Sequence, residues 1–233
     1  RVGRGEEKGY YLAPQQVFSR LLYYLAVEKK LKGRVVQAVS LGYLSERIAA
    51  DYNLPFKEIP VGFKYVTEEI LKGGVVLGGE ESGGYAFSRT SQKAGLILPE
   101  RDGILSALLV LEMLVKSGKK VSEILKKMQK RYGVSHFLRN DIVLERPVPD
   151  KRAFIAEMQS RFPSDWLGMK VREMKTLDGL KVVLQDGSWV LIRPSGTEPL
   201  MRTYAEFPKK DQSRKSLAKI SQIVAKALKN QAQ

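Results

Sequence analysis

The sequence contains no cysteine and only one histidine among its 233 residues. The absence of cysteine excludes disulfides, cysteine-ligated metal centres and thiol nucleophiles, and it is compatible with a reducing cytosol. A single histidine excludes a multi-histidine metal site and leaves one possible base for a Ser-His-Asp triad. That histidine, His136, lies in a stretch typical of a connector, which favours an incidental polar loop residue.

Long apolar segments and export signals are also missing. The longest apolar run covers residues 103–115 and is interrupted by Glu112, so it is too short to span a membrane. No secretory signal is recognisable. We therefore expect a cytoplasmic protein without a membrane partner. Because the chain begins with Arg1 rather than Met, we also expect it to be a piece of a longer protein.

The formal net charge of +15 raises the question of nucleic-acid binding. Residues 1–139 contain 23 Lys and Arg against 14 Asp and Glu, and residues 140–233 contain 17 against 11, so the excess is spread over both halves. No helix-turn-helix, arginine-rich arm or aromatic-basic pattern accompanies it. We interpret the charge as solvated surface that also attracts anionic metabolites, and a basic nucleic-acid-binding or scaffold protein stays as the alternative.

The chain divides into two regions of different style. In the first, helical and strand patterns alternate, which predicts a layered α/β domain with a mixed sheet over residues 1–133. Its expected strands are 34–40, 56–61 and 75–77, and its expected helices are 13–33, 44–52, 65–72, 103–116 and 123–131. Asp102 and Ser122 are the expected caps of the last two helices.

Residues 134–139 are the expected linker, because the periodicity stops there. Residues 140–233 predict a smaller α+β domain with an antiparallel sheet and flanking helices. Two Asp-Gly pairs, at 178–179 and 186–187, favour hairpin turns between strands. The expected helices are 150–161 and 211–229, and the expected strands are 171–176, 181–185, 189–193 and 201–206.

One loop between two expected strands has the composition of a phosphate cradle. It reads Arg-Pro-Ser-Gly-Thr-Glu-Pro at residues 193–199. A phosphoryl dianion needs several converging donors, which a guanidinium, two hydroxyls and backbone N–H groups supply. The alternative is a tight polar hairpin whose hydroxyls only satisfy their own turn. The candidate phosphate-binding residues are Arg193, Ser195, Gly196 and Thr197.

A second loop, Gly-Gly-Glu-Glu-Ser-Gly-Gly at residues 78–84, follows the expected strand 75–77. Ligands commonly bind at strand ends in α/β sheets, and glycines permit a close approach of the backbone. A carboxylate and a serine hydroxyl suit the recognition of a sugar or polyol. A flexible acidic turn is the alternative. Lys64, after another expected strand, is a weaker candidate for contact with a phosphate or sugar oxygen.

These stretches together resemble the α-D-phosphohexomutases, the phosphoglucomutase/phosphomannomutase family. Residues 61–64, 78–84, 100–104 and 193–199 occur in the order and approximate spacing of that family's motifs. The resemblance covers nearly the whole chain and corresponds to the C-terminal half of the family, its domains 3 and 4. Residues 1–3 resemble the tail of the metal loop that precedes domain 3.

The resemblance implies a fold, a reaction and a set of site residues. The family interconverts hexose 1-phosphate and hexose 6-phosphate, here glucose or mannose, through a phosphoserine, Mg²⁺ and a glucose 1,6-bisphosphate-type intermediate. By resemblance, the sugar contacts are Glu80 and Ser82 with the neighbouring Gly79 and Gly83, and the phosphate contacts are Arg193, Ser195, Gly196, Thr197 and Lys64. A phosphoglucosamine mutase is a less expected identity on the same resemblance.

The same resemblance implies a limit on what this chain does alone. The phosphoserine loop and the metal ligands of the family have no counterpart in the sequence. Without a nucleophile and a metal there is no group to transfer, so we expect the chain to bind hexose phosphate without turnover. The missing N-terminal domains 1 and 2 are the expected partners, and no catalytic or metal-ligating residue is expected here.

Overall fold

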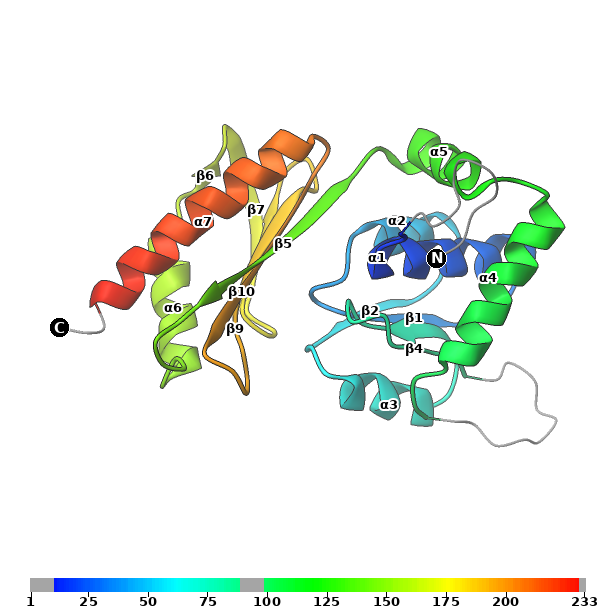
Figure 1. The fold of residues 1–233 in the computed structure, drawn as a ribbon, viewed down its shortest axis with the longest axis horizontal. Coiled ribbons are helices and arrows are strands. Elements are labelled where there is room, and N and C mark those ends of the chain that lie inside the picture. Colours follow the sequence, from blue (N-terminus) through cyan, green and yellow to red (C-terminus); the bar gives the residue numbers. More distant parts are fainter. Residues whose placement is uncertain (1–10, 89–98, 231–233) are drawn as a thin grey trace. The chain divides into compact units, whose positions relative to one another are not determined.

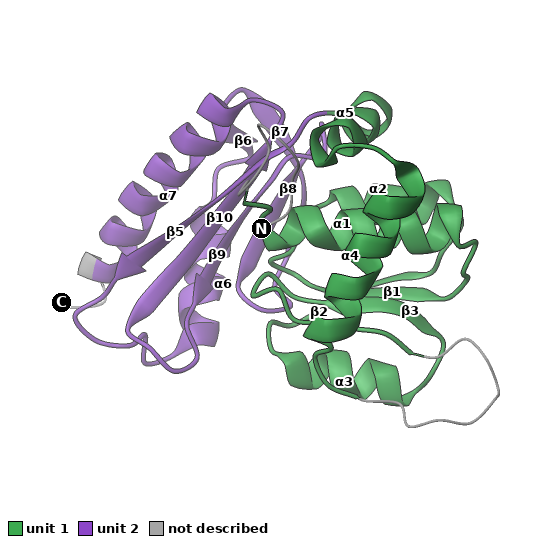
Figure 2. Cartoon of the chain, turned by 45° about the vertical axis from the view of Figure 1, so that its right-hand side comes forward, with its two compact units in different colours: residues 1–133 green, residues 134–233 purple. Residues whose placement is uncertain are grey.

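The computed structural model of the chain describes residues 11–88 and 99–230, except for the side chains of the last two of these. The chain separates into two compact units, residues 1–133 and 134–233, which are coloured separately in Figure 2. The expected metal-loop tail at residues 1–3 lies outside the described residues. No described helix has both the length and the apolar character needed to cross a membrane.

Unit 1 is a three-layered α/β domain (Figure 1). Its sheet has the order β2-β1-β3-β4, in which β1 pairs in parallel with β2 and β3 while β4 pairs antiparallel with β3. The strands are β1 (Arg34–Ala38), β2 (Phe56–Ile59), β3 (Val75–Gly79) and β4 (Tyr85–Ala86). The helices are α1 (Pro14–Tyr23), its π-helical continuation η2 (Tyr24–Glu28), α2 (Leu44–Asp51), α3 (Phe63–Leu71), α4 (Gly103–Ser117) and α5 (Val121–Tyr132).

The side chains of the parallel strands alternate between the two faces of the sheet, which explains the three layers. Val35 and Leu77 belong to the core shared with α1, η2 and α2, whereas Val36 and Val75 belong to the core shared with α3. Successive side chains of a strand point to opposite faces, so a parallel strand supplies both cores, and β1 and β3 are apolar along most of their length. The predicted α/β class with a mixed sheet is therefore confirmed.

The strand order of unit 1 creates a switch point. The chain leaves β1 and returns beside it as β2, and then crosses to the other side of β1 to form β3. Loops that follow the carboxyl ends of β1 and β3 diverge there, which is where open α/β sheets bind ligands. Ser40 follows β1 and Glu80 follows β3 at this edge.

Unit 2 is a two-layered α+β domain with a sheet ordered β5-β10-β9-β8-β7-β6, antiparallel throughout. The strands are β5 (His136–Val143), β6 (Asp165–Trp166), β7 (Met169–Lys175), β8 (Leu180–Leu184), β9 (Trp189–Pro194) and β10 (Leu200–Phe207). Helices α6 (Lys151–Arg161) and α7 (Lys210–Asn230) share one core with the same face of this sheet (Figure 1). The predicted α+β class is confirmed as well.

Some element limits differ from the sequence-based expectations. Residues 136–139, expected in the linker, form the first half of β5, which pairs with β10 from end to end. Helix α5 begins at Val121 with Lys120 as its cap residue, so the expected Ser122 cap is wrong. The physical reason is a capping-box contact in which the Lys120 backbone N–H donates to Glu123 Oε2 at 2.7 Å.

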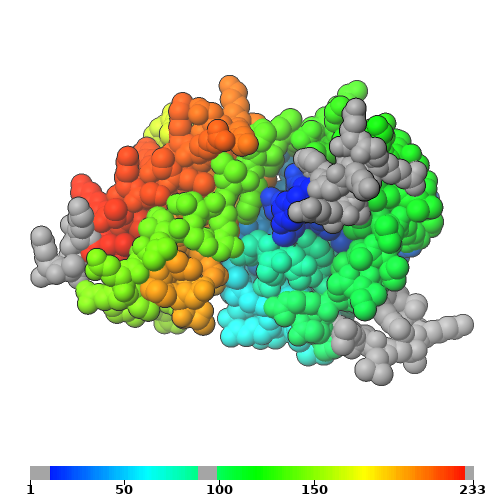
Figure 3. Space-filling view, in the orientation of Figure 1, coloured from blue at the N-terminus to red at the C-terminus, as the bar shows by residue number. Residues whose placement is uncertain are grey.

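Helix α4 begins where expected but exposes much of its apolar surface. Asp102 caps it through a hydrogen bond from the Leu105 N–H to Asp102 Oδ1 at 2.7 Å. Only three residues of the helix are buried, namely Ser106, Leu109 and Met113. The exposed apolar side chains are Ile104, Leu105, Leu108, Leu111 and Val115. Part of this surface belongs to the green region at the right of Figure 3.

Candidate functional site

The loop between β9 and β10 is closed by its own hydrogen bonds. The Ser195 N–H donates to the Leu200 carbonyl at 2.8 Å, and the Glu198 N–H donates to Ser195 Oγ at 3.3 Å. Ser195 is buried, whereas Gly196 and Thr197 are exposed at the tip. The predicted cradle is therefore a hairpin loop with a fixed base and an accessible tip.

Arg193 supplies a buried donor beside this loop. Its side chain is only 10% exposed, and its Nε donates to Asp178 Oδ2 at 2.8 Å. Its Nη1 is buried and has no hydrogen-bond partner among the described residues. A buried donor without an acceptor costs about 1–3 kcal/mol, so this guanidinium is suited to an anion that would satisfy it.

Asp178 was not recognised as a site residue from the sequence, which predicted only a hairpin turn at 178–179. The structure shows why a turn residue reaches Arg193. Gly179 has a φ of +97°, and a Cβ there would lie 2.5 Å from the Ile192 carbonyl oxygen and 3.0 Å from Arg193 Cα. Only glycine allows the β7–β8 turn to lie against β9 so closely. The turn then holds Asp178 next to the Arg193 guanidinium.

Arg202 adds a second cation at the same loop. It lies directly opposite Arg193 in the β9–β10 register, and its Nη2 donates to Glu198 Oε2 at 2.5 Å. Its Nε is buried without a hydrogen-bond partner in the described part of the chain. The pKa of Asp141, on the neighbouring strand β5, is lowered mainly by a hydrogen bond from Arg139. The positive charge of Arg202 lowers this pKa further.

A third cation approaches the tip of the loop from α6. Lys151 Nζ lies 3.8 Å from where a Cβ on Gly196 would be. Two guanidiniums and an ammonium thus gather around a short loop with two hydroxyls, which is the donor set that a phosphoryl dianion requires. The sequence analysis missed Lys151 because 45 residues separate it from Gly196.

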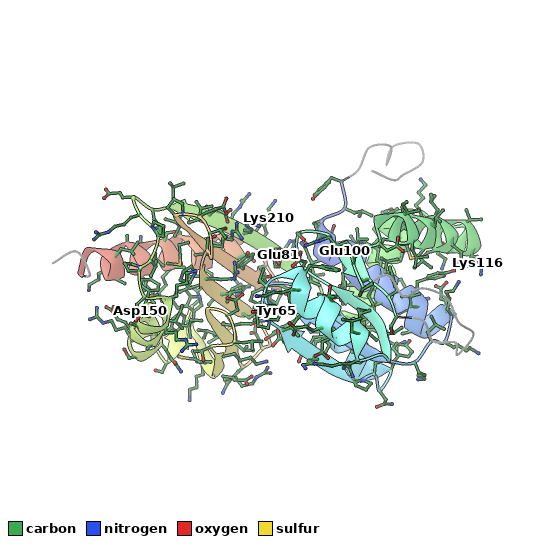
Figure 4. All side chains as sticks on the ribbon, turned by 90° about the horizontal axis from the view of Figure 1, so that it is seen from below. Tyr65, Glu81, Glu100, Lys116, Asp150 and Lys210 are labelled. Carbon is green, nitrogen blue, oxygen red and sulfur yellow. The ribbon has the colours of Figure 1, made fainter. Side chains whose placement is uncertain are left out.

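The corresponding loop of unit 1 follows β3 and is built around Glu80. Glu80 is 5% exposed, and its Oε1 accepts a hydrogen bond from Ser82 Oγ at 2.7 Å. Arg101 Nη2 lies 3.2 Å from the same oxygen. The adjacent Glu81, labelled in Figure 4, accepts a hydrogen bond from Ser40 Oγ across the switch point between β1 and β3. The structure thus brings the predicted pair Glu80 and Ser82 together.

Glycines shape this loop. The Gly83 N–H donates to the Glu80 carbonyl and the Glu80 N–H donates to the Gly84 carbonyl, both at 3.1 Å, and Gly83 has a φ of +90°. At Gly79 a Cβ would lie 2.7 Å from the Tyr85 ring and 2.8 Å from the Phe18 ring. Gly79 therefore serves the packing of β3, while Gly83 permits the turn. Burial raises the pKa of Tyr85, whose hydroxyl donates to the Pro14 carbonyl at 2.7 Å.

Lys64 is the second residue of α3, after the carboxyl end of β2. Its side chain is exposed, and Nζ lies 4.9 Å from the centre of the Tyr65 ring. No hydrogen bond or ion pair joins Lys64 to the Glu80 loop within the described residues. The structure therefore places Lys64 at the edge of the sheet where it was expected, with its side chain in solvent.

Two family profiles match the chain. One, described as phosphoglucomutase/phosphomannomutase, alpha/beta/alpha domain III, matches residues 13–132. The other, described as phosphoglucomutase/phosphomannomutase, C-terminal domain, matches residues 114–223. The chain belongs to the phosphoglucomutase/phosphomannomutase family. The expected correspondence with the third and fourth domains of the family is confirmed.

Curated relatives agree in family but differ in their assigned substrates. The phosphoglucomutase/phosphomannomutase of Thermococcus kodakarensis is 27% identical, with 96% of this chain and 44% of the relative covered. The phosphoglucosamine mutase of Methanocaldococcus jannaschii is 32% identical, with 96% and 46% covered. The chain thus spans less than half the length of these relatives.

Solved structures show the same fold. A provisionally assigned phosphomannomutase from Thermus thermophilus matches with a TM-score of 0.73 and 29% identity, covering 97% of this chain and 44% of that one. The Paramecium phosphoglucomutase parafusin, in its open form, matches with a TM-score of 0.70 and 19% identity over 94% of this chain and 42% of that one. The family's fold therefore extends over both units.

Proposed function

We propose that this chain is the sugar- and phosphate-binding part of a phosphohexomutase, an isomerase that interconverts hexose 1-phosphate and hexose 6-phosphate. The observation that carries the proposal is the buried Nη1 of Arg193, which has no hydrogen-bond partner among the described residues and lies beside a loop with two hydroxyls. A phosphate oxygen at that place would accept from Nη1 and relieve the cost of the orphaned donor. Membership of the mutase family supports this reading.

Each loop has a separate role in this proposal. Arg193, Ser195, Gly196 and Thr197 of unit 2 bind the phosphate. Lys64 of unit 1 is a separate candidate for contact with a phosphate or sugar oxygen. Glu80 and Ser82 accept hydrogen bonds from the sugar hydroxyls, with Gly79 and Gly83 shaping the loop. Ser82 already donates its hydroxyl proton to Glu80 Oε1. The Ser82 oxygen and the Glu80 carboxylate therefore remain available to accept hydrogen bonds from hydroxyls of the sugar ring.

Turnover would require groups that the family places elsewhere. In the family, a phosphoserine donates and recovers the phosphoryl group, a glucose 1,6-bisphosphate-type intermediate turns over, and Mg²⁺ stabilises the developing charge. Among residues 11–88 and 99–230, no three acidic or histidine side chains are grouped so that they could hold a metal ion. These residues do not fit a Mg²⁺ site, so we propose that the chain alone binds substrate without catalysing the reaction.

The substrate is proposed to be glucose phosphate or mannose phosphate. Glu80 and Ser82 can recognise hydroxyls that these two sugars share, and neither residue selects between them. Relatives include phosphoglucosamine mutases, and glucosamine carries an amino group at C2 where glucose and mannose carry a hydroxyl. Glucosamine 1-phosphate is therefore the necessary comparison ligand.

Isothermal titration calorimetry with glucose 1-phosphate tests the proposal. We expect saturable binding that is weakened about tenfold or more by Arg193→Ala, because a charge-assisted hydrogen bond is worth roughly 1.5–3 kcal/mol. Arg161→Ala is the control, since Arg161 is an exposed residue of α6 that pairs with Glu157 and should be replaceable without loss of binding. Unchanged affinity in Arg193→Ala would remove Arg193 from the phosphate role.

A DNA oligonucleotide tests the alternative. Affinity for the oligonucleotide that falls steeply with salt, combined with no selectivity for sugar phosphates, would favour the basic nucleic-acid-binding protein over the mutase. Titrations of mannose 1-phosphate and glucosamine 1-phosphate under the same conditions give affinities that rank the three sugar phosphates.

A further inference from the structure

We infer that Arg101 is a positioning residue for Glu80: it fixes one carboxylate oxygen so that the other faces a sugar hydroxyl. This inference rests on the proposed function and adds a residue to its sugar-binding loop. From the sequence alone, residues 100–103 were explained by the Asp102 helix cap. The contacts of Arg101 are a separate observation.

Both contacts of the Glu80 carboxylate fall on the same oxygen. Ser82 Oγ donates to Oε1 at 2.7 Å and Arg101 Nη2 lies 3.2 Å from Oε1. No other hydrogen bond or ion pair of the Glu80 side chain occurs within the described residues. Two donors on Oε1 restrict rotation of the Glu80 side chain and so fix the orientation of its carboxylate. Oε2 remains able to accept a hydrogen bond. The arrangement therefore presents one oriented acceptor at the carboxyl end of β3.

The Arg101 guanidinium is itself held from two further directions. It lies over the Phe63 ring with 4.3 Å between Cζ and the ring centre. Its Nη1 lies 3.1 Å from Oε1 of Glu100, a residue labelled in Figure 4. The contact with the aromatic ring and the hydrogen bonds to two carboxylates together restrict the rotation of the Arg101 side chain.

Gly84 provides the space for this arginine. A Cβ on Gly84 would lie 2.9 Å from both Cδ and Nε of Arg101. The Gly84 backbone has no positive φ, so alanine is permitted there by conformation and would conflict only with the arginine. The arginine stem thus occupies the volume that any side chain at position 84 would need.

The backbone before α4 brings Arg101 to the loop. The Asp102 N–H donates to the Tyr85 carbonyl at 2.8 Å, which ties the start of α4 to the end of the loop. The Asp102 carboxylate then caps the helix. Arg101 directly precedes this cap and is therefore anchored through its C-terminal neighbour. Its side chain is 49% exposed, so it can be replaced without opening a core.

A positioning role predicts a specific pattern of affinities for glucose 1-phosphate in isothermal titration calorimetry. Arg101→Gln should weaken binding about tenfold, because it removes a charged hydrogen-bond partner of Glu80. Arg101→Lys should recover part of the loss by restoring the charge without the fork. In the background of Glu80→Gln, Arg101→Gln should add less than about twofold, because the two residues act through one carboxylate. Arg161→Gln is the matched control and should not change the affinity.

A second pair of variants moves Arg101 without removing it. Gly84→Ala should weaken binding several-fold by displacing the arginine stem. Gly103→Ala is the matched control, because a Cβ on Gly103 meets no atom within 4 Å and its φ is not positive. Both variants should keep the melting temperature of the unmodified chain within a few degrees, which separates loss of positioning from loss of folding.

The outcomes separate this inference from the proposed function. If Glu80→Gln weakens binding and Arg101→Gln does not, the positioning role of Arg101 is wrong and the sugar role of Glu80 stands. If the effects of Arg101→Gln and Glu80→Gln add in full, Arg101 contacts the ligand directly and the positioning role is again wrong. If the unmodified chain binds no hexose phosphate, the proposed function fails and the inference fails with it.

Discussion

Replacing Gly179 with alanine should destabilise unit 2 through one identifiable contact. Gly179 forms the β7–β8 turn with a φ of +97°, a conformation that L-residues with a Cβ rarely adopt. A Cβ there would lie 2.5 Å from the Ile192 carbonyl oxygen and 3.0 Å from Arg193 Cα. Both are backbone atoms of β9, so no side-chain rotation can relieve the contact.

The magnitude has two parts. Alanine in the positive-φ region costs about 1–2 kcal/mol. Forcing a methyl group against a packed backbone adds roughly 1–3 kcal/mol. We therefore expect Gly179→Ala to lower the free energy of unfolding of unit 2 by about 2–5 kcal/mol. For a unit of this size, each kcal/mol lowers the melting temperature by roughly 4–8 °C.

Tryptophan fluorescence during urea unfolding measures this unit selectively. The sequence has two tryptophans, Trp166 and Trp189, and both are buried in unit 2. Gly168→Ala is the matched control, because Gly168 also has a positive φ, +79°, and a Cβ there meets nothing within 4 Å. The control should show only the conformational cost of about 1–2 kcal/mol.

The comparison can refute the reasoning. If Gly179→Ala and Gly168→Ala lose the same stability, the close approach of the turn to β9 has no energetic consequence, and the account of how Asp178 reaches Arg193 is wrong. A larger loss in Gly179→Ala, accompanied by weaker binding of glucose 1-phosphate, would link the turn to the phosphate loop.

Two further predictions concern ion pairs. Asp178→Asn should weaken glucose 1-phosphate binding several-fold in calorimetry, because it releases the Arg193 guanidinium from its 2.8 Å contact. Asp178→Glu should bind glucose 1-phosphate more tightly than Asp178→Asn does. Equal affinity in the unmodified chain and both variants would contradict this prediction. Hydrogen bonds from Lys57 and Lys72 lower the pKa of Glu69 from 4.5 to about 2. That shift corresponds to at most about 3 kcal/mol, which we reduce to about 1–2 kcal/mol because both lysines are exposed to salt and solvent. Because the pKa of Glu69 is depressed, its ionised carboxylate stabilises the fold above pH 4.5, and this contribution is lost as the pH falls towards 2. Thermal unfolding followed by circular dichroism should therefore show Glu69→Gln to be less stable than the unmodified chain at pH 7 and equally stable near pH 2.

The sequence predicted the architecture well because the apolar periodicity was strong. Strands β1, β3, β8, β9 and β10 were each expected within a few residues of their observed limits. The Asp102 cap followed from local chemistry, and Asp102 accepts the expected backbone hydrogen bond. Such features depend on residues within one or two turns of one another, so a sequence pattern contains them.

The misses have a common cause in contacts between distant residues. β5 was partly taken for a linker because residues 136–139 pair with residues of β10 that lie 65–71 positions further along the chain. Helix 103–116 was expected, but the sequence did not indicate which side of it packs inward: the helix buries Leu109 and Met113 and exposes Leu108 and Val115. An unusually apolar helix has no polar face to indicate which side packs inward.

The candidate site shows the same division at the level of single residues. Glu80, Ser82, Arg193 and Ser195 were found because each belongs to a compact motif. Their supports, Arg101 and Asp178, were not found, since each is 15 or more residues away along the chain and was already explained as part of a cap or a turn.

Both loops combine a charge suited to a ligand with an opposite charge that holds it. Asp178 neutralises Arg193 in unit 2, and Arg101 neutralises Glu80 in unit 1. Removing either support would leave a buried charge uncompensated, which costs more than the pair itself contributes to stability. In each case a glycine, Gly179 or Gly84, supplies the space for the support. The affinity of each loop should therefore be more sensitive to its glycine than the small size of that residue suggests, because the glycine determines the direction in which the charged group points.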